Sequence, residues 1–406
     1  MNKTGYDART IMAFLVFNRS TKFDFYNWLA DAGRDVYAIT SKPMNRPGKY
    51  KLIRKFDDLN SPLADQLALE IGRSAPLQYL ASQSEYDMLR VAALRESLGL
   101  AGQSVASARA YRDKVTMKDC MAAAGVPTAR YRRLEVATDL PAFIDAHDYP
   151  VVVKPVDAAG SRGVRVLKDA RDLHDFQLDP PARQYMVETF VSGKMYHVNG
   201  LLRGGRYEFI VPYRYINSSL DYQAHGCYGS MTMQPDTALG ERLVTFCKRV
   251  IAALPPTDPL AFHAEIFCAD DGTLLLNEIA SRTAGSLIIE LIEQDYGFNL
   301  SRAWVRAQCG LDTQIGAGAR PQCYSASLMF PTRDAALRAL PFTTPFEWCT
   351  NLFVNGRQGM VNGRAATYTD DVLSVIVTGA SEAQTAERVA EASAWLEARI
   401  VWQAAH

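Results

Sequence analysis

The sequence has no excess of charge of either sign, because its 44 lysines and arginines are balanced by 44 aspartates and glutamates. A neutral chain gives no indication of a nucleic-acid partner or of a polybasic membrane-binding surface. No apolar run approaches the roughly 20 residues that a membrane-spanning helix needs. The N-terminal segment leads into a short apolar strand without a cleavage site, so we expect no signal peptide and a cytoplasmic location.

Cysteine pairs and metal-binding motifs are also absent. The seven cysteines are scattered and never in CxxC spacing, and the six histidines show no HExxH spacing. This pattern disfavours a disulfide framework or a zinc site and fits the reduced thiols of a cytosolic protein. The two common nucleotide motifs are missing too, since there is no GxxxxGK[ST] loop and no Gly-rich loop that opens a helix.

A length of 406 residues with 48% hydrophobic residues allows two or three domains with sizeable cores. The pattern near the N-terminus predicts strands at 11–17, 36–40 and 77–81 and helices at 23–32 and 84–98. We therefore expect an open α/β domain over residues 1–105. Its functional edge is expected at the strand tips, around 18–20 and 82–85, where helix capping by Ser84 is the alternative.

The most informative stretch lies at residues 149–168. A β-branched run ends in Lys154, and after a short gap come a small, Gly-rich loop and a second β-rich run, which predicts strand, loop, strand. Small side chains let backbone N–H groups approach an anion closely, and phosphate is the usual guest of such a loop. Lys154 would add a positive charge beside it. The alternative is a plain hairpin with a surface lysine. The loop reads Ala158-Ala159-Gly160-Ser161-Arg162-Gly163.

Charged residues occur in the elements around this hairpin. Residues 107–124 predict one helix with Lys114 and Lys118 on one face, and lysines at this spacing usually form a solvated face. Residues 185–191 predict a strand that contains Glu188, a carboxylate that needs a partner among its apolar neighbours.

A second hairpin, at residues 262–280, carries Glu265 and Glu278 in two apolar strands joined by a DDG turn. Antiparallel pairing would bring the two carboxylates to the same level and the same face. Two adjacent carboxylates repel unless a cation lies between them or one is protonated, and hard oxygen ligands near a phosphate site suggest Mg²⁺. The alternative is that each glutamate pairs with a neighbour such as Arg282 or His263.

Further hairpins, strands and helices are expected between and after these stretches, and residues from about 311 look like a separate C-terminal α+β piece. The expected elements are a hairpin of strands 195–202 and 207–213, strands at 228–234, 323–330 and 372–378, and helices at 173–177, 240–254, 287–296 and 382–399.

The order and spacing of five residues resemble the pattern of the ATP-grasp superfamily over roughly residues 105–310. These residues are Lys114, Lys154 before the Gly-rich loop, Glu188, Glu265 and Glu278. The resemblance implies an ATP-grasp fold of two α+β subdomains at 106–310, with a lid subdomain at about 126–191. It also implies a pre-ATP-grasp α/β domain at 1–105 and a C-terminal α+β extension at 311–406.

The resemblance implies a role for each matching position. The loop, with Ala159, Gly160, Ser161 and Gly163, would close over the β- and γ-phosphates of ATP, and Lys114 and Lys154 would contact phosphates. Glu188 and the backbone near Val191 would hold the adenine. Glu265 and Glu278 would bind Mg²⁺, with Mn²⁺ as an alternative, and Arg282 would steady the transferred phosphoryl group or the acyl phosphate.

The sequence departs from the family pattern at two places. The usual Glu-x-Asn of the metal strand is Glu278-Ile279-Ala280 here, so the third metal ligand is missing. The usual acidic ribose contact falls on Met195, so His197 or Asn199, on the same face of that strand, are the candidates for contacting ribose or substrate. Residues 195–200 and 278–282 look like ATP-grasp ligases of secondary-metabolite and small-peptide pathways.

We therefore expect a carboxylate–amine ligase that works through an acyl phosphate on small-molecule substrates. Arg214 is the candidate for binding a substrate carboxylate, with Tyr222, Gln223 and His225 nearby, and a surface ion pair is the alternative for Arg214. The other hypotheses are a ligase that loads an amino acid onto the thiol of an acyl-carrier protein, and an inactive nucleotide-binding protein. The family often dimerises, so a homodimer is also an expectation.

Overall fold

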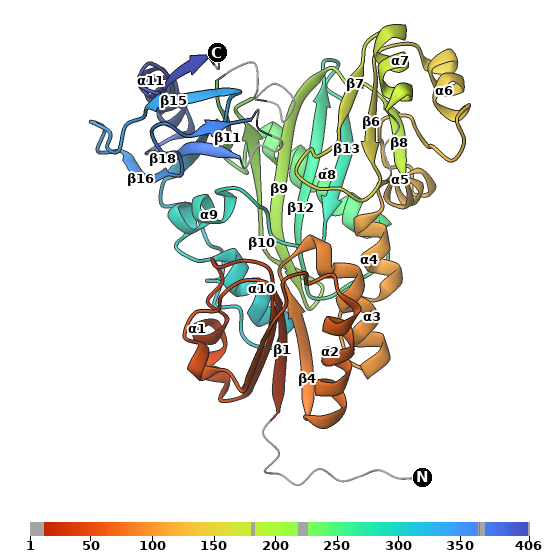
Figure 1. Cartoon of the computed structure of the whole chain (residues 1–406), viewed down its shortest axis with the longest axis vertical. Coiled ribbons are helices and arrows are strands. Elements are labelled where there is room, and N and C mark those ends of the chain that lie inside the picture. Colours follow the sequence, from red (N-terminus) through yellow and green to blue (C-terminus); the bar gives the residue numbers. More distant parts are fainter. Residues whose placement is uncertain (1–11, 180–182, 218–225, 364, 366–369, 405–406) are drawn as a thin grey trace.

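The computed structural model describes residues 12–179, 183–217, 226–363, 365 and 370–404. Within these residues, no helix has both the length and the apolar character that crossing a bilayer requires. All seven cysteines are free thiols. Figure 1 shows a lower N-terminal unit, a central sheet above it, a small sheet at the upper right and the C-terminal segment at the upper left.

The N-terminal unit is a four-stranded parallel sheet in the order β3-β2-β1-β4. Alternate residues of β1 are buried on opposite faces, Phe14 and Val16 on one and Leu15 and Phe17 on the other, which explains its continuous apolar run. The strands and helices predicted here are confirmed, and β3 and α2 were not predicted. The elements are β1 (Ala13–Asn18), α1 (Phe25–Leu29), η1 (Ala30–Ala32), β2 (Asp35–Thr40), η2 (Pro47–Lys49), β3 (Leu52–Lys55), α2 (Pro62–Ser74), β4 (Leu77–Ser82), η3 (Glu85–Asp87) and α3 (Met88–Leu98).

The single helix predicted at 107–124 is wrong, because the chain forms two helices that meet at Asp113. These are α4 (Val105–Arg112) and α5 (Lys114–Ala123). Asp113 has an extended backbone, and its side chain accepts hydrogen bonds from the backbone N–H groups of Val115 and Thr116. It is therefore the N-cap of α5, and the break places Lys114 at the first position of a new helix.

The small sheet, which we call the lid sheet, has the order β5-β8-β6-β7 and is antiparallel throughout. Its own core includes Phe143, Val151, Val153 and Val187. The predicted strand, loop, strand unit is confirmed as β6 and β7. The elements are β5 (Tyr131–Arg133), α6 (Asp139–His147), β6 (Val151–Pro155), β7 (Arg165–Leu167), α7 (Ala170–Leu178) and β8 (Tyr185–Thr189).

The large sheet has eight strands in the order β13-β12-β9-β10-β11-β14-β18-β16. Helices α5 and α8 contribute to the core on one face, and α9 and α10 contribute to the core on the other. The strands are β9 (Gly193–Arg203), β10 (Arg206–Tyr215), β11 (Tyr228–Thr232), β12 (Leu260–Ala269), β13 (Leu274–Ala280), β14 (Tyr324–Pro331), β16 (Cys349–Val354) and β18 (Asp371–Gly379). The helices are α8 (Ala238–Ala253), α9 (Ile288–Tyr296) and α10 (Leu300–Gln308).

The C-terminal segment joins this sheet rather than standing beside it. Strand β14 pairs with β11 and β18, so the large sheet runs across residue 310. The domain boundaries expected at 105 and 310 stay predictions. The remaining elements are α11 (Glu382–Glu397), which packs on β14 and β18, and a three-stranded sheet of β15 (Ala335–Ala339), β17 (Val361–Asn362) and β19 (Val401–Ala404).

Candidate active site

A cleft of about 260 Å³ lies between the lid sheet and the large sheet. Its walls come from β6, β8, β12, β13 and the first residue of α5, so segments far apart in sequence meet there. Nine of the residues singled out in the sequence line it: Lys114, Lys154, Ala159, Gly160, Ser161, Glu188, Val191, Glu265 and Glu278. Gly163, His197, Arg214 and Arg282 are not among its lining residues.

The Gly-rich loop between β6 and β7 forms one rim of the cleft. Gly160 and Ser161 have φ angles of 69° and 57°, a left-handed conformation that turns successive N–H groups in one direction. Gly163 has a structural role, since its carbonyl accepts a hydrogen bond from the Tyr185 hydroxyl at 2.9 Å. A Cβ atom at Gly163 would lie 2.7 Å from that hydroxyl.

Three lysines in this region are buried rather than solvated, so the surface alternatives for Lys114, Lys118 and Lys154 are wrong. Lys114 Nζ lies 3.0 Å from Glu278 Oε2 and donates a hydrogen bond to the carbonyl of Ala158 at 2.7 Å. The ammonium group therefore joins the start of the loop to one of the two paired carboxylates.

Glu188 is the counterion of the two other buried lysines. Its carboxylate lies 2.6 Å from Lys154 Nζ and 3.1 Å from Lys118 Nζ. Burial alone would raise the pKa of Glu188, but the charges of Lys118 and Lys154 outweigh it and lower the pKa to about 2. Glu188 is thus ionised and holds Lys154 at the cleft, and the adenine contact expected of it stays a prediction.

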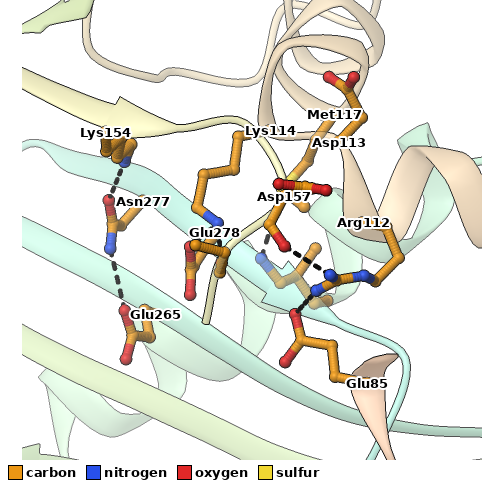
Figure 2. A network of polar contacts seen from close by, with 12 residues as sticks. Glu85, Arg112, Asp113, Lys114, Met117, Lys154, Asp157, Glu265, Asn277 and Glu278 are labelled. Carbon is orange, nitrogen blue, oxygen red and sulfur yellow. Dashed lines mark hydrogen bonds and ion pairs between the residues drawn. The ribbon is translucent and has the colours of Figure 1, made fainter. Parts of the chain in front are cut away.

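Glu265 and Glu278 are directly paired across β12 and β13, as predicted. A β-bulge follows this pair, because Ile266 pairs with Leu276 and Asn277 is the extra residue. The bulge lets Asn277 reach the same side as Glu278. Its amide accepts a hydrogen bond from Lys154 at 2.9 Å and donates one to Glu265 at 2.9 Å, so Asn277 lies between the two, as Figure 2 shows.

His197 and Asn199 lie behind Glu265 and are completely buried. Asn199 hydrogen-bonds to His197 at 2.9 Å and to His263 at 2.8 Å, and His263 Nε2 lies 3.6 Å from Glu265. Burial lowers the pKa of His197 well below its usual value, so the ring is neutral. His197 and Asn199 do not line the cleft, whereas Met195 on the same strand does. The contact with ribose or substrate expected of His197 or Asn199 stays a prediction.

Arg282 lies at the end of β13 and pairs with Glu85 of the N-terminal unit. Its Nε atom donates to Glu85 Oε2 at 2.9 Å. Arg112 donates to the other oxygen of Glu85 and, at 2.5 Å, to the carbonyl of Asp157 just before the Gly-rich loop. Figure 2 shows Arg112 reaching both partners from the end of α4.

Arg214 lies on the wrong face of the sheet for the role predicted for it. Its neighbour Tyr215 donates a hydrogen bond to Glu265 at 2.7 Å, and successive residues of a strand point to opposite faces. Arg214 pairs with Tyr196, which belongs to the core beneath α8, and lies 3.7 Å from Glu382. The ion-pair alternative therefore describes Arg214 better. Tyr222, Gln223 and His225 fall outside the described residues.

Comparison with known proteins agrees with this geometry. Residues 119–293 match the model of the ATP-grasp domain. The chain contains an ATP-grasp domain. It is 24% identical over 242 residues to an L-arginine-specific L-amino acid ligase of Bacillus subtilis, a match that covers 58% of each protein. It is 26% identical over 200 residues to dapdiamide A synthase of Enterobacter agglomerans, which covers 46% of each. The chain thus matches about half the length of these curated relatives.

The ATP-grasp domain and the segments around it also share their fold with solved structures. The crystal structure of an L-amino acid ligase from Bacillus licheniformis superposes with a TM-score of 0.75 and 16% identity, covering 98% of this chain and all of that one. An ADP complex of an N5-carboxyaminoimidazole ribonucleotide synthetase superposes with a TM-score of 0.68 and 14% identity, covering 95% and 97%. At these identities the likeness shows the fold.

Sequence reasoning missed the parts played by three residues in or around the cleft, Asn277, Lys118 and Glu85. Strict alternation along β13 puts Asn277 and Glu278 on opposite faces, so only the polar pair inside an apolar strand hinted at the bulge. Lys118 was assigned to a solvated face because helical spacing does not show what covers a helix. Glu85 was predicted only as one residue of the strand tip at 82–85, and no local sequence pattern indicated Arg112 or Arg282 as its partners.

Proposed function

We propose that the chain is an ATP-dependent ligase that activates a small carboxylate, such as that of an amino acid, as an acyl phosphate and joins it to an amine. ADP and phosphate are the other products. The observation that carries this proposal is the cleft, in which a Gly-rich loop, two lysines and a directly paired Glu265 and Glu278 converge within an ATP-grasp domain.

The chemistry requires groups of this kind. A carboxylate is a poor electrophile, and transfer of the γ-phosphoryl group from ATP gives it a leaving group. Negative charge spreads over the phosphoryl oxygens during the transfer, and positioned cations stabilise it. Lys114 and Lys154 have their ammonium groups at the cleft and supply two of these cations. The loop at 158–163 covers the phosphates and keeps water from the acyl phosphate.

Glu265 and Glu278 fit a magnesium ion, with manganese as an alternative. Mg²⁺ is usually held by one or two carboxylates together with phosphate oxygens and water, so a pair of glutamates is sufficient. The described residues contain no group of three or more histidine, cysteine or acidic side chains that could hold a metal alone. When bound, the ion would neutralise charge on the phosphates.

The acceptor is proposed to be an amine of a small molecule. One relative named above is an L-amino acid ligase and the other is a dapdiamide A synthase, and the L-amino acid ligase supports an amino acid as the acceptor. An acyl-carrier thiol, a homodimer and the cytoplasmic location have no such support and stay predictions.

Nucleotide product release tests the proposal. The protein is incubated with ATP, Mg²⁺ and pools of amino acids and carboxylic acids, with Glu278→Ala as the blank. The matched control is Glu290→Ala, which removes a partly exposed glutamate paired with the exposed Lys22. We expect ADP that depends on a pool, persists in Glu290→Ala and is lost in Glu278→Ala.

The other outcomes contradict parts of the proposal. AMP in place of ADP would mean that the carboxylate is adenylated. ADP that forms only when a carrier protein is added, with the protein gaining the mass of the acyl group, would replace the amine by a thiol. Tight ATP binding without ADP from any pool would indicate a binding protein.

A further inference from the structure

Glu85 belongs to the N-terminal unit but has its carboxylate among residues of the ATP-grasp side. It starts η3, three positions after the last residue of β4, near the edge where ligand-contacting residues of open α/β sheets gather. Its side chain is 10% exposed. The cleft does not include it. Glu85 is therefore outside the proposed nucleotide site but close to it.

The two partners of Glu85 are arginines next to cleft residues in the sequence. Arg112 precedes Lys114 by two positions, and Arg282 follows Glu278 by four. Each oxygen of Glu85 serves one arginine: Oε1 accepts from Arg112, and Oε2 accepts from Arg282 Nε at 2.9 Å and Nη2 at 2.5 Å. Arg112 also holds the carbonyl of Asp157, at the base of the Gly-rich loop.

The electrostatics keep this carboxylate charged. Burial alone would raise the pKa of Glu85, but Arg282, Arg112 and Lys114 together lower it to about 2. Without its charge, two guanidinium groups would face each other across a largely buried space. Leaving buried charges unpaired is strongly unfavourable, so the arginines would shift to other partners.

A role in holding the N-terminal unit in place does not require Glu85. Arg306 of α10 already pairs with Asp31 at 2.7 Å, and Gln308 bonds to both backbone groups of Ser82. Gln83, two positions before Glu85, donates to the carbonyl of Ser301 at 2.6 Å. These contacts attach the N-terminal unit without touching the loop or the end of β13.

We propose that Glu85 is a positioning residue of the phosphoryl-transfer step, which fixes Arg282 at the end of the metal strand and, through Arg112, the base of the Gly-rich loop. This inference rests on the proposed function. It makes the N-terminal unit part of the catalytic apparatus. The carboxylate of Glu85 orients the side chains of Arg112 and Arg282, which lie near Lys114 and Glu278 in the sequence.

The test uses Glu85→Gln, which keeps the shape of the side chain and removes its charge. We expect kcat for ADP release to fall roughly 10- to 100-fold, because displacement of about 1 Å at a reacting group costs this much. The KM for ATP should change less than about threefold, since Glu85 does not line the cleft and binding and turnover respond separately.

Asp87 provides the matched control. It lies in the same short η3 helix, is fully buried, and also bridges two arginines, Arg19 at 2.7 Å and Arg90 at 3.4 Å, but both belong to the N-terminal unit. Asp87→Asn should lower the unfolding midpoint at least as much as Glu85→Gln and leave kcat within about twofold, because neither Arg19 nor Arg90 contacts the Gly-rich loop or the end of β13.

A double-mutant cycle with Arg282→Lys separates positioning from general damage. If Glu85 acts through Arg282, Glu85→Gln should lower kcat less than about threefold in the Arg282→Lys background, because residues that act as a unit are not additive. Equal kcat for Glu85→Gln and the wild type, or full additivity in the cycle, would overturn this proposal alone. A wild-type protein that releases no ADP from any pool would instead overturn the proposed function, and this proposal with it.

Discussion

The carboxylate of Glu188 is the counterion of two buried ammonium groups, those of Lys118 and Lys154. Glu188→Gln would leave both cations without a counterion. Removal of one partner from a buried pair costs about 3–5 kcal/mol, so we expect the free energy of unfolding in urea to fall by roughly that amount. Glu290→Gln, whose partner Lys22 is well exposed, should cost less than about 1 kcal/mol. Equal losses for both variants would contradict the assignment of Glu188.

The same residue makes a pH-dependent contribution. The pKa of Glu188 is about 2 in the folded protein, below its ordinary value of 4.5. The unfolded chain therefore binds the proton more readily, so the stabilisation is complete above pH 4.5 and is lost as the pH falls from there towards 2. The difference in unfolding free energy between wild type and Glu188→Gln should be constant near neutral pH and shrink below about pH 4.5. A constant difference down to pH 3 would be contrary evidence.

At this scale the sequence predicted residue types better than residue partners. Lys114, Lys154, Glu265 and Glu278 were all expected at one site and all line the cleft. Arg214 was misplaced because its face depends on the register of β10, which the sequence of one strand does not determine. His197 was placed on the correct strand, but burial depends on residues such as Tyr213, whose ring stacks on it at 5.1 Å.

At the scale of elements, the bulge in β13 shapes the site most directly, because it brings the side chain of Asn277 between Lys154 and Glu265. Asn277→Ala would remove both hydrogen bonds, so Glu265 and Lys154 would lose their fixed separation. We expect the Mg²⁺ concentration that gives half-maximal ADP release to rise roughly tenfold, a typical effect of losing a residue that orients a metal ligand. The control is Asn355→Ala, which loses only an exposed bond to Asp371. An unchanged Mg²⁺ dependence would mean that Asn277 does not orient Glu265.

The start of β9 depends on a glycine that lines the cleft. Gly193 has a φ angle of 146°, and a Cβ atom there would lie 2.2 Å from the carbonyl oxygen of Cys268 on β12. Gly193→Ala should push β9 away from β12 and displace residues 190–192, raising the KM for ATP roughly tenfold, or about 1.4 kcal/mol. Gly205 at the far end of β9 also has a left-handed φ, of 70°, but no atom within 4 Å of the added Cβ. Gly205→Ala should therefore lower stability and leave this KM unchanged, and a similar KM for both variants would contradict the argument.

Neither the bulge nor the break at Asp113 follows from periodicity. A helical pattern continues through 107–124 because the apolar positions of α4 and α5 happen to keep a common spacing. The break is visible only in the capping bonds that Asp113 makes to the backbone of α5. Strands with a continuous apolar run, such as β1 and β6, were predicted well. Every residue of these strands is buried, so the apolar run in the sequence marks the whole strand.

At the scale of the whole molecule, the extent of the large sheet was not predicted, and the domain boundaries stay predictions. The βαβ pattern, the hairpin of β6 and β7 and the hairpin of β12 and β13 are local in sequence, and each was recognised. The pairing of β11 with β14 joins residues about 100 positions apart, as in Ser230 with Ser327, and no local pattern encodes such a contact.

A truncated protein that ends at residue 310 tests whether the rest of the chain folds without the C-terminal segment. The cut removes β14, β18 and α11 and exposes the buried edge and face of β11, including Met231, which packs with Leu328 and Val375 in one core. We therefore expect the shortened chain to aggregate, or to lose cooperative unfolding followed by circular dichroism. Excision of residues 129–190 with a short Gly-Ser linker is the control, because the lid sheet has its own core, and that protein should unfold cooperatively but no longer bind ATP. A soluble, cooperatively folded protein ending at 310 would show that the boundary expected from the sequence is a true domain boundary, and that the eight-stranded sheet does not need its last three strands.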